Sequence, residues 1–355
     1  MTRFCLLGEI PAPFRVPLFN ALAERVTFQA LFLAETDPRR THYRIHTDEM
    51  RFDWSVLRGR SVRRGGRWLV LSRGVTRALR AFNPDVVGVG GWNQPAFWQA
   101  VVWCKVRRCS LVVWVESTAK DTRSEARPLE WARRGMVRAA DAFFVPGTAS
   151  REYLRSLGVA DERIAVAPNA VDPAIFGAAA TDRANRDGCV FLYAGRLDPE
   201  KGLDTLVRAF ESVPGTLVLA GGGTEERRLR ALAGERVRFT GTVGRDELVP
   251  LLREADVFVL PSRSEPWGMV LNEAAAAGLP LVATQGVGAA RDLVDGNGIV
   301  VPVGDEEALA DALRRLAEDP GLRVRMGARS RELAASFTPE SWADAVARLV
   351  NRLSR

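Results

Sequence analysis

The chain has 355 residues, of which 50 are Lys or Arg and 43 are Asp or Glu, giving a formal net charge of +7. Domains of roughly 100–200 residues are usual, so this length predicts two domains. The hydrophobic share of 47% is that of a globular protein and argues against a disordered or fibrous chain. His42 and His46 are the only histidines and no G-x-S-x-G motif is present, so Ser-His-Asp hydrolases are poor candidates.

The expected compartment follows from the cysteines and the apolar runs. The four cysteines show no C-x-x-C spacing, so a disulfide framework is not expected. The N-terminus enters a strand pattern without the apolar core of a signal peptide. No run approaches the roughly 18 apolar residues of a membrane-spanning helix. We therefore expect a cytoplasmic protein, and leave open its attachment to the inner membrane face.

Short apolar runs alternate with helical patterns from the N-terminus onward. In the first half, strands are predicted at Phe4–Gly8, Phe28–Ala34, Asp85–Gly90, Leu111–Glu116, Ala142–Pro146 and Ile164–Ala167. Helices are predicted at Val16–Arg25, Trp68–Phe82, Pro95–Val106, Leu129–Ala140 and Ala149–Leu157. The strands show no polar alternation, which is typical of parallel sheets buried on both faces.

The alternation starts again after a segment rich in Gly, Ala, Asp and Asn. Strands are predicted at Val190–Ala194, Leu217–Ala220, Val237–Thr240, Val257–Leu260, Leu281–Ala283 and Ile299–Val301. Helices are predicted at Leu203–Val213, Glu225–Ala233, Asp246–Ala255, Met269–Ala277, Glu306–Glu318, Leu322–Ser336 and Pro339–Leu353. We therefore predict an α/β protein with two Rossmann-like, doubly wound domains facing each other across a cleft. They comprise residues 1–176 and 189–338, joined by a linker at 177–188.

The first polar motif follows the strand Val190–Ala194. The chain turns at Gly195, and Arg196 and Lys201 precede the next helix. Two cations beside the positive end of a helix dipole form an anion site suited to a diphosphate. Only three lysines stand beside 47 arginines, so a Lys here indicates a need for a compact ammonium group. The alternative is a surface turn with incidental charges.

The second polar motif follows the strand Val257–Leu260. Glu265 lies in a loop, and Glu273 lies eight residues further on, about two helical turns, so both could face the cleft. Gly268 leaves its own backbone N–H group and those of the next two residues open to a ligand. The first carboxylate could accept hydrogen bonds from sugar hydroxyls and the second could hold a ribose diol. Helix capping by Glu265 and a solvated Glu273 is the alternative.

The glycine-rich turns do not complete the motifs of two other classes of nucleotide-binding protein. Gly221–Gly223 is weak evidence alone, because such turns occur in most doubly wound proteins. Gly286-Val287-Gly288 does not complete a G-x-G-x-x-G fingerprint, and no G-x-x-x-x-G-K-[ST] loop is present. Both facts argue against dinucleotide-dependent oxidoreductases and P-loop NTPases.

In this order, the motifs resemble those of family 4 retaining glycosyltransferases of the GT-B fold. The resemblance rests on Gly-Arg-Leu…Lys-Gly at 195–202, Phe-Thr-Gly at 239–241 and Pro-Ser…Ser-Glu-Pro-Trp-Gly…Asn-Glu-Ala at 261–274. It is strong over residues 189–302 and looser in the first half, through Pro84–Val86 and Asn169–Asp172. The C-terminal helix of that fold commonly crosses back onto the N-terminal domain, which the resemblance implies for residues 339–355.

The resemblance also implies roles for the matched residues. Arg196 and Lys201 would bind the donor diphosphate, Glu265 the donor sugar and Glu273 the ribose, with Gly241 and Val243 beside the base. The implied donor-binding set is Gly195, Arg196, Lys201, Gly241, Val243, Glu265, Trp267, Gly268, Met269, Val270 and Glu273. Family members usually need no metal, and the sequence has no D-x-D triplet. We expect no cofactor beyond the co-substrate, a nucleotide-diphosphate sugar, with UDP favoured.

The acceptor side departs from the commoner family pattern. Glu9 lies where many members have a Gly-Gly loop after the first strand, and Glu116 stands where many have a His. Glu116 could orient an acceptor hydroxyl or stabilise positive charge at the anomeric carbon. It could instead pair with Lys120 at a helix start and be structural. The acceptor-side set is Glu9, Arg15, Glu116 and Lys120, and the catalytic candidates are Glu265, Arg196, Lys201 and Glu116.

Positive charge is concentrated in the first half. Arg51–Arg80 holds nine Arg and one acidic residue, with Trp54 and Trp68 among them. Such a stretch suits anionic lipid or a phosphorylated acceptor, or it is a solvated face. Nucleic acid is not expected, because its common binding signatures are absent. Residues 1–176 carry 27 basic and 17 acidic residues against 23 and 26 in residues 177–355, which predicts an anionic acceptor or an anionic surface presenting it.

The sequence thus predicts a retaining glycosyltransferase. It would move a sugar from a nucleotide-diphosphate sugar to a hydroxyl of a small-molecule, glycan or lipid-linked acceptor. A nucleotide-sugar epimerase of the same fold is one alternative, although it would need acids and bases in the cleft. A basic protein that binds nucleic acid or membranes, with a non-catalytic nucleotide site, is the other.

Overall fold

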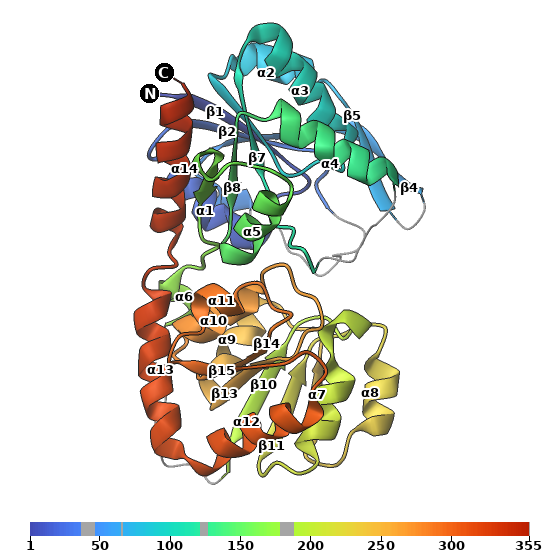
Figure 1. Ribbon diagram of the computed structural model, residues 1–355, viewed down its shortest axis with the longest axis vertical. Coiled ribbons are helices and arrows are strands. Elements are labelled where there is room, and N and C mark those ends of the chain that lie inside the picture. The colour runs from blue at the N-terminus through green and yellow to red at the C-terminus, as the bar shows by residue number, and fades with distance from the viewer. Residues whose placement is uncertain (37–46, 65–66, 121–126, 178–187, 355) are drawn as a thin grey trace. The chain divides into compact units, whose positions relative to one another are not determined.

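A computed structural model describes residues 1–36, 47–64, 67–120, 127–177 and 188–354, and the chain divides into two compact units (Figure 1). The first comprises residues 1–168 and 339–355, and the second residues 169–338. Each is built on a parallel sheet flanked by helices, which confirms the predicted α/β class. His42 and His46, and most of the predicted linker at 177–188, lie outside the described residues.

The sheet of the first unit has seven parallel strands in the order β3-β2-β1-β6-β7-β8-β9. They are β1 (Arg3–Gly8), β2 (Thr27–Phe32), β3 (Asp53–Val56), β6 (Val86–Val89), β7 (Ser110–Trp114), β8 (Ala142–Val145) and β9 (Ile164–Val166). The helices are α1 (Val16–Ala23), α2 (Val75–Phe82), α3 (Pro95–Arg107), α4 (Arg127–Ala139), α5 (Thr148–Ser156) and α14 (Pro339–Leu353). A separate antiparallel hairpin joins β4 (Arg58–Arg64) and β5 (Arg67–Arg73).

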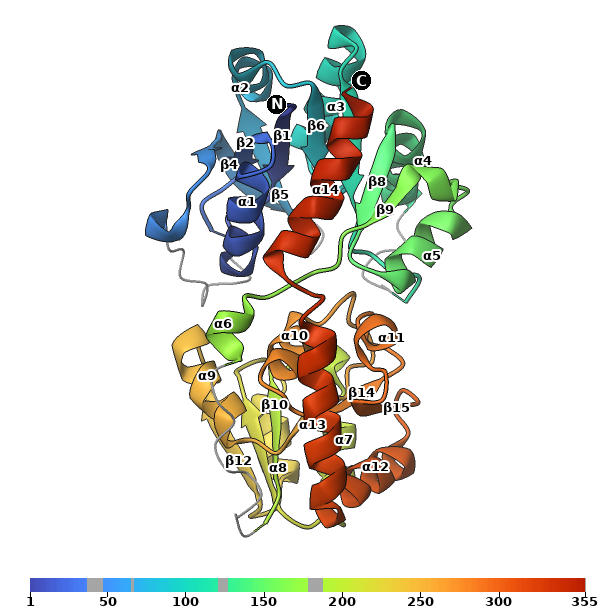
Figure 2. The ribbon, with the colours of Figure 1, turned by 90° about the vertical axis from the view of Figure 1, so that its left-hand side faces the viewer.

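One face of this sheet is lined with aromatic side chains. Alternate residues of a strand point to opposite faces, and rings on one face join Phe28, Trp114 and Phe144 to Phe19 of α1 and Trp342 of α14. Trp342 is fully buried, with its ring centroid 5.5 Å from that of Trp114. Helix α14, drawn in red, therefore lies beside α1 and packs against the sheet of the first unit, to which it belongs (Figure 2).

The second unit has a six-stranded parallel sheet in the order β12-β11-β10-β13-β14-β15. The strands are β10 (Val190–Ala194), β11 (Thr216–Ala220), β12 (Val237–Gly241), β13 (Val257–Leu260), β14 (Leu281–Thr284) and β15 (Gly298–Val301). The helices are α6 (Pro173–Phe176), α7 (Leu203–Phe210), α8 (Glu226–Leu232), α9 (Arg245–Glu254), α10 (Met269–Ala276), α11 (Ala290–Leu293), α12 (Glu306–Glu318) and α13 (Pro320–Ala334), with a 3-10 turn, η5, at Pro199–Lys201.

Two sequence predictions differ from this structure. The helix predicted over Trp68–Phe82 is a strand, β5, followed by α2, because Gly74 at φ 92° separates them. Residues 169–176, predicted in the first domain, belong to the second unit. There the Asn169 carbonyl accepts a hydrogen bond from Asn272 Nδ2 at 2.9 Å, and Phe176 is buried in the second core.

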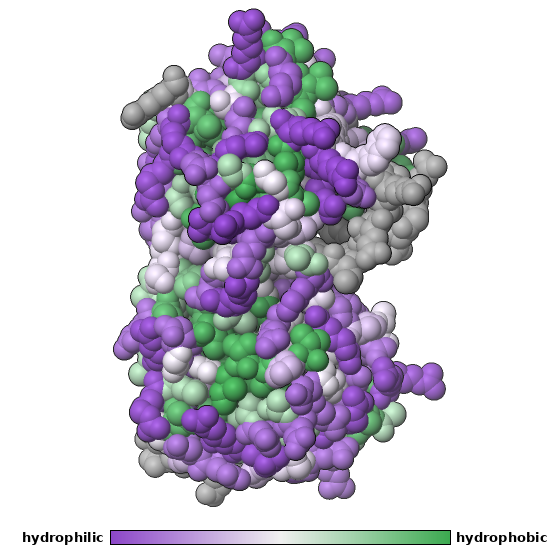
Figure 3. Space-filling view, in the orientation of Figure 1, coloured by the Kyte–Doolittle hydropathy of each residue, from purple (hydrophilic) through white to green (hydrophobic). Residues whose placement is uncertain are grey.

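The surface mixes polar and apolar side chains. On the face shown in Figure 3, hydrophobic patches lie between hydrophilic residues in both units. None of the described helices is long and apolar enough to span a bilayer. Burial raises the pKa of the Cys189 thiol to about 12, so this thiol stays protonated as a small core residue.

Candidate functional site

The polar motifs of the second unit gather where the strand order reverses. Strand β10 lies between β11 and β13, so the loops that leave its carboxyl end and that of β13 are neighbours. Ligands of doubly wound sheets bind at such a point. The first loop carries Arg196 and Lys201, and the second carries Glu265.

An ion pair between Lys201 Nζ and Glu265 Oε2 joins these two loops. The two side chains are only 12% and 18% exposed. The backbone supports the contact, because the N–H groups of Arg263 and Ser264 both donate to the Glu200 carbonyl, at 2.8 and 3.3 Å. Removing one partner would leave the other charge in a poorly solvated place.

Glycines bring the backbone close to Glu265. Gly268, at φ 97°, precedes α10, and a Cβ there would lie 3.3 Å from Glu265 Cγ and 2.9 Å from Leu260 Cδ2. Gly288 N donates to the Glu265 carbonyl at 2.9 Å, and a Cβ on Gly288 would come within 1.9 Å of the Pro266 carbonyl oxygen. The Gly286–Gly288 turn, which does not complete a dinucleotide fingerprint, therefore supports the Glu265 loop. Sequence reasoning missed this role.

Glu273 and Trp267 occupy contrasting environments. Glu273, on α10, is half-buried, and its carboxylate makes no hydrogen bond or ion pair with any described residue. Burial raises its pKa from the ordinary 4.5 to about 7. The indole of Trp267 is buried and donates from Nε1 to Asn272 Oδ1 at 2.8 Å. Of the two, Glu273 has the unused hydrogen-bonding capacity, and Trp267 is a core side chain.

Arg196 is half-exposed and held by its own carboxylates. It pairs with Asp198 and, at 2.7 Å, with Glu200 Oε1. Its backbone carbonyl accepts a 2.7 Å hydrogen bond from the buried Tyr193 hydroxyl, whose pKa burial raises well above its ordinary value. The structure thus gives Arg196 and Lys201 separate partners at the same end of β10.

The remaining predicted donor residues lie at the same edge of the sheet. At the ends of β10 and β11, a Cβ on Gly221 would come within 1.8 Å of the Gly195 carbonyl oxygen. Gly241 closes β12 at φ 77°, and Val243 follows it, half-buried. Met269 and Val270 open α10 and pack partly against the core. The four strand ends therefore present most of the predicted set along one edge.

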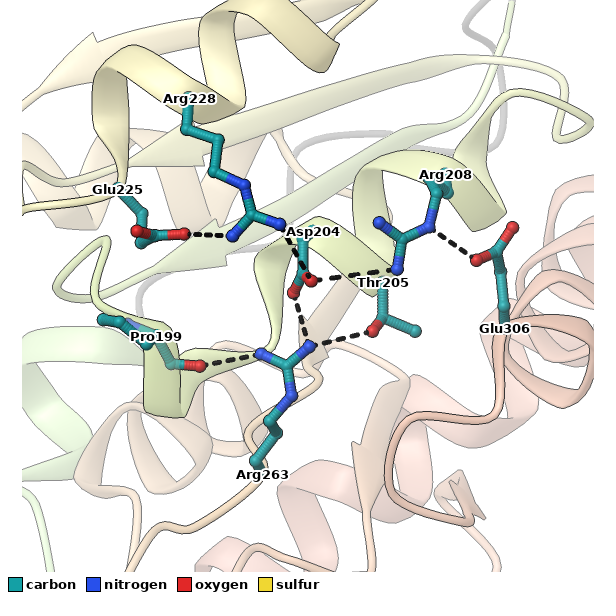
Figure 4. Close-up of polar contacts among 8 residues, drawn as sticks. All are labelled: Pro199, Asp204, Thr205, Arg208, Glu225, Arg228, Arg263 and Glu306. Carbon is teal, nitrogen blue, oxygen red and sulfur yellow. Dashed lines mark hydrogen bonds and ion pairs between the residues drawn. The ribbon is translucent and has the colours of Figure 1, made fainter.

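A second ionic cluster fixes the loop of Lys201. Arg263 donates to the Pro199 carbonyl and to Asp204 Oδ1, both at 2.7 Å, and Arg208 and Arg228 approach the other Asp204 oxygen at 3.7 and 3.8 Å (Figure 4). Burial alone would raise the pKa of Asp204, but the hydrogen bond and charge of Arg263 outweigh it and lower the pKa. Arg263 therefore clamps the start of α7 to the loop that follows β13.

We expect Asp204→Asn to lower the free energy of unfolding by about 1–2 kcal/mol near pH 7, because it removes a charged hydrogen bond. A carboxyl with a lowered pKa contributes stability above its ordinary pKa and loses it as the pH falls through the lowered value. The difference from wild type should therefore shrink as the pH falls below the ordinary carboxyl pKa and disappear once Asp204 is protonated. Urea unfolding over a series of falling pH values measures this. Asp246→Asn, at a side chain 89% exposed, is the control, and an equal loss there would contradict the clamp.

In the first unit, Arg15 and Glu116 come together. Arg15 Nη2 donates to Glu116 Oε2 at 2.8 Å, and the guanidinium lies 4.1 Å from the ring centroid of Trp114. The Glu116 side chain extends from the loop after β7, and no helix begins between it and the exposed Lys120. Whether Glu116 also pairs with Lys120 stays a prediction.

Glu9, at the end of β1, is held separately. Its Oε1 accepts hydrogen bonds from Asn93 Nδ2 at 2.9 Å and Gln94 Nε2 at 2.8 Å. The buried Gln94 in turn accepts from Val70 N of β5 at 3.0 Å. Glu9 is thus tied to the β4–β5 hairpin, a connection that no local sequence pattern signals.

Family models match both halves of the chain. One described as glycosyl transferases group 1 matches residues 180–333, and one described as glycosyltransferase family 4 matches residues 19–175. Glycogen synthase of Mycobacterium tuberculosis is 30% identical over 318 residues, covering 83% of this chain and 74% of that protein.

Other relatives match over shorter stretches. A D-inositol 3-phosphate glycosyltransferase of Acidothermus cellulolyticus is 38% identical over 218 residues, which cover 54% of this chain and 48% of that protein. The chain thus spans about half the length of that relative.

Among solved structures, HepE of Anabaena in complex with UDP and glucose has a TM-score of 0.79 at 18% identity, covering 99% of this chain and 100% of that chain. That likeness shows a shared GT-B fold. With family models over both halves and a relative matched over most of its length, this chain belongs to the family 4 glycosyltransferases.

Proposed function

We propose that this protein transfers a sugar from a nucleotide-diphosphate sugar, with a UDP-sugar favoured, to an acceptor hydroxyl. The observation that carries the proposal is the ion pair between Lys201 and Glu265, which joins the loops after β10 and β13. Glu273, on α10, has no side-chain partner among the described residues. A cation, a sugar-binding carboxylate and a further acceptor of hydrogen bonds suit the three parts of such a donor. The HepE structure, a complex with UDP and glucose, supports the choice of donor.

In this proposal the donor competes with internal carboxylates. Its diphosphate takes Lys201 from Glu265 and Arg196 from Asp198 and Glu200, which frees Glu265 for the sugar hydroxyls. Glu273 accepts hydrogen bonds from the ribose, and Gly241 with Val243 borders the base. Because the cations are already paired, affinity depends on the diphosphate being a better partner than the carboxylates.

The proposed reaction proceeds with retention and without a metal or another cofactor. The diphosphate gains negative charge as the C1–O bond of the sugar breaks, and Lys201, Arg196 and the N-terminal amides of α10 stabilise that charge. The acceptor hydroxyl attacks C1 from the face that the leaving group vacates and gives its proton to the departing diphosphate. On the acceptor side, Glu116 orients the hydroxyl, and Arg15 fixes the Glu116 carboxylate at 2.8 Å.

We further propose an anionic acceptor, either a small molecule, a glycan or a lipid-linked molecule at the inner membrane face. The positive surplus of residues 1–176 supports this. The names of two relatives, a D-inositol 3-phosphate glycosyltransferase and a lipopolysaccharide core biosynthesis glycosyltransferase of Rhizobium meliloti, agree with it.

The test measures UDP release from UDP-glucose, after a thermal-shift screen of nucleotide diphosphates has fixed the base. Inositol phosphate and lipopolysaccharide core serve as acceptors. We expect Glu265→Ala to lower kcat by about 10²–10³-fold, the usual cost of removing one group that stabilises the transition state. Glu235→Ala, at an exposed residue outside the site, should leave the rate unchanged.

Two outcomes would overturn the proposal. In the first, wild type and Glu265→Ala release UDP at one background rate with every acceptor. In the second, the UDP-sugar is converted to an isomeric UDP-sugar without release of UDP, which is the reaction of an epimerase.

A further inference from the structure

A basic groove of about 1100 Å³ lies between the β4–β5 hairpin and α2 of the first unit. Four arginines line it: Arg58 and Arg60 from β4, Arg73 from the end of β5 and Arg77 from α2. None of its described lining residues is acidic. A concave surface with one sign of charge concentrates counter-ions, so the groove is suited to an anion.

These four guanidinium groups make no hydrogen bond or ion pair with any described residue. In the second unit, by contrast, Arg208, Arg228 and Arg263 all converge on one carboxylate. Within the hairpin, Arg58 stands directly opposite Arg73. Like charges at directly opposite positions destabilise a β pair, and an anion bridging them would remove that repulsion.

The same face of the hairpin also exposes aliphatic side chains. Cross-strand pairing sets Arg60 opposite Leu71 and Val62 opposite Leu69. Leu71 is 52% exposed and Val62 is 40% exposed. The other face, with Trp68 and Val70, is buried and packs toward α3. The outer face therefore combines unpaired cations with uncovered hydrocarbon.

The hairpin is a fixed part of the first unit. Gln94, before α3, accepts a hydrogen bond from Val70 N at 3.0 Å and donates to the Trp68 carbonyl at 3.2 Å. The same Gln94 amide donates to Glu9 at 2.8 Å. A ligand on the outer face of the hairpin would thus lie on the same unit as the residues assigned to the acceptor side, connected to Glu9 through Gln94.

We propose that this face docks on a membrane rich in anionic phospholipid. Headgroup phosphates enter the groove and contact Arg58, Arg60, Arg73 and Arg77, while Leu71 and Val62 lie against the apolar layer beneath. Basic residues around exposed aliphatic side chains are the pattern of proteins that lie on membranes. The inference deepens the acceptor side of the proposed function, and it is tested without donor or turnover.

The experiment is co-sedimentation of the full chain with vesicles of phosphatidylcholine alone or mixed with phosphatidylglycerol. We expect binding only to the mixed vesicles, and weaker binding at higher salt. Arg58→Gln/Arg73→Gln should reduce the partition coefficient roughly tenfold or more, because each surface Arg contributes measurably to attraction by anionic lipid. Leu71→Ser should weaken binding at high salt, where the apolar contact dominates.

The matched control is Arg227→Gln/Arg315→Gln, which removes the same charge from exposed helical positions of the second unit. An equal loss of vesicle binding in the two double variants would show that only net charge matters and would overturn the proposed site. The site would also be overturned if wild type bound both kinds of vesicle equally or bound neither. Full release of the protein by millimolar glycerol 3-phosphate would assign the groove to a soluble phosphate ester and overturn the membrane source.

Failure of this inference can be told apart from failure of the proposed function. UDP binding, followed by thermal shift, should be the same in wild type and in Arg58→Gln/Arg73→Gln. If the protein binds UDP and releases it from UDP-glucose but does not bind vesicles, only the membrane docking is overturned. If the protein binds vesicles through the groove but neither binds UDP nor releases it from UDP-glucose, only the proposed sugar transfer is overturned.

Discussion

Lys201→Met is expected to weaken UDP binding by about 10–100-fold while uridine binding stays nearly unchanged. A hydrogen bond to a charged group contributes about 1.5–3 kcal/mol, and each 1.4 kcal/mol is tenfold in affinity. Lys201 is only 12% exposed and points into the loop pair at the ends of β10 and β13. Its loss therefore affects the diphosphate and spares the nucleoside. Titration calorimetry with UDP and with uridine measures both affinities.

A structural role for Lys201 needs a separate control, because the substitution also leaves Glu265 unpaired. We expect Lys201→Met to lower the melting temperature, because it leaves the Glu265 carboxylate in a poorly solvated place without a compensating charge. Lys201→Met/Glu265→Gln should restore the melting temperature but not the UDP affinity. Lys105→Met, at an exposed residue of α3, should change neither. Equal losses of UDP and uridine affinity would contradict the assignment of Lys201 to the diphosphate.

Glu273→Gln is expected to stabilise the protein at alkaline pH. The pKa of Glu273 is raised from 4.5 to about 7 by burial. Below the ordinary value the carboxyl is protonated in both states and costs nothing. Between the two values the unfolded chain ionises first, so stability falls as the pH rises. Above the raised value the full cost of about 3 kcal/mol remains. Urea unfolding should show the variant more stable at about pH 8 and equal at about pH 4.

The same substitution is expected to weaken UDP-glucose binding by about tenfold, because an amide is a poorer acceptor for ribose hydroxyls than a carboxylate. Wild-type affinity should rise as the pH increases through the raised pKa of about 7, and the variant should lose that dependence. Glu235→Gln is the matched control. A variant with wild-type affinity and no gain in stability would show that Glu273 is neither desolvated nor used by the donor.

The positions of these residues could be predicted because they depend on local pattern. Apolar runs mark β10 and β13, and polar residues directly after a parallel strand lie at the ligand-binding edge. The positions of Lys201, Glu265 and Glu273 near this edge could therefore be predicted, while their roles stay a prediction. The ion pairs around the site could be predicted only in part. Arg196 and Glu200 are four residues apart, so their pairing could have been predicted. The contact of Arg263 with Asp204 spans 59 residues and has no local signal.

The hairpin escaped prediction for a different reason. Residues 68–71 read Trp-Leu-Val-Leu, an unbroken apolar run in which the alternation of buried Trp68 and Val70 with exposed Leu71 is hidden. The run leads into the helical pattern of α2, so the two were merged. In the same way, Asn169–Phe176 looks like the end of the first domain. Its long-range contacts, the hydrogen bond to Asn272 and the burial of Phe176 in the second core, assign it to the second unit.

The packing of α14 has a consequence for the order in which the chain folds during synthesis. The aromatic face around Trp114 and Phe144 is covered by Trp342, which is made only after the whole second unit. The second unit contains every strand of its own sheet and can form while α14 is still unmade. Until then the first unit exposes rings that attract other apolar surfaces. The unit whose strands are translated first is therefore the one that completes its fold last.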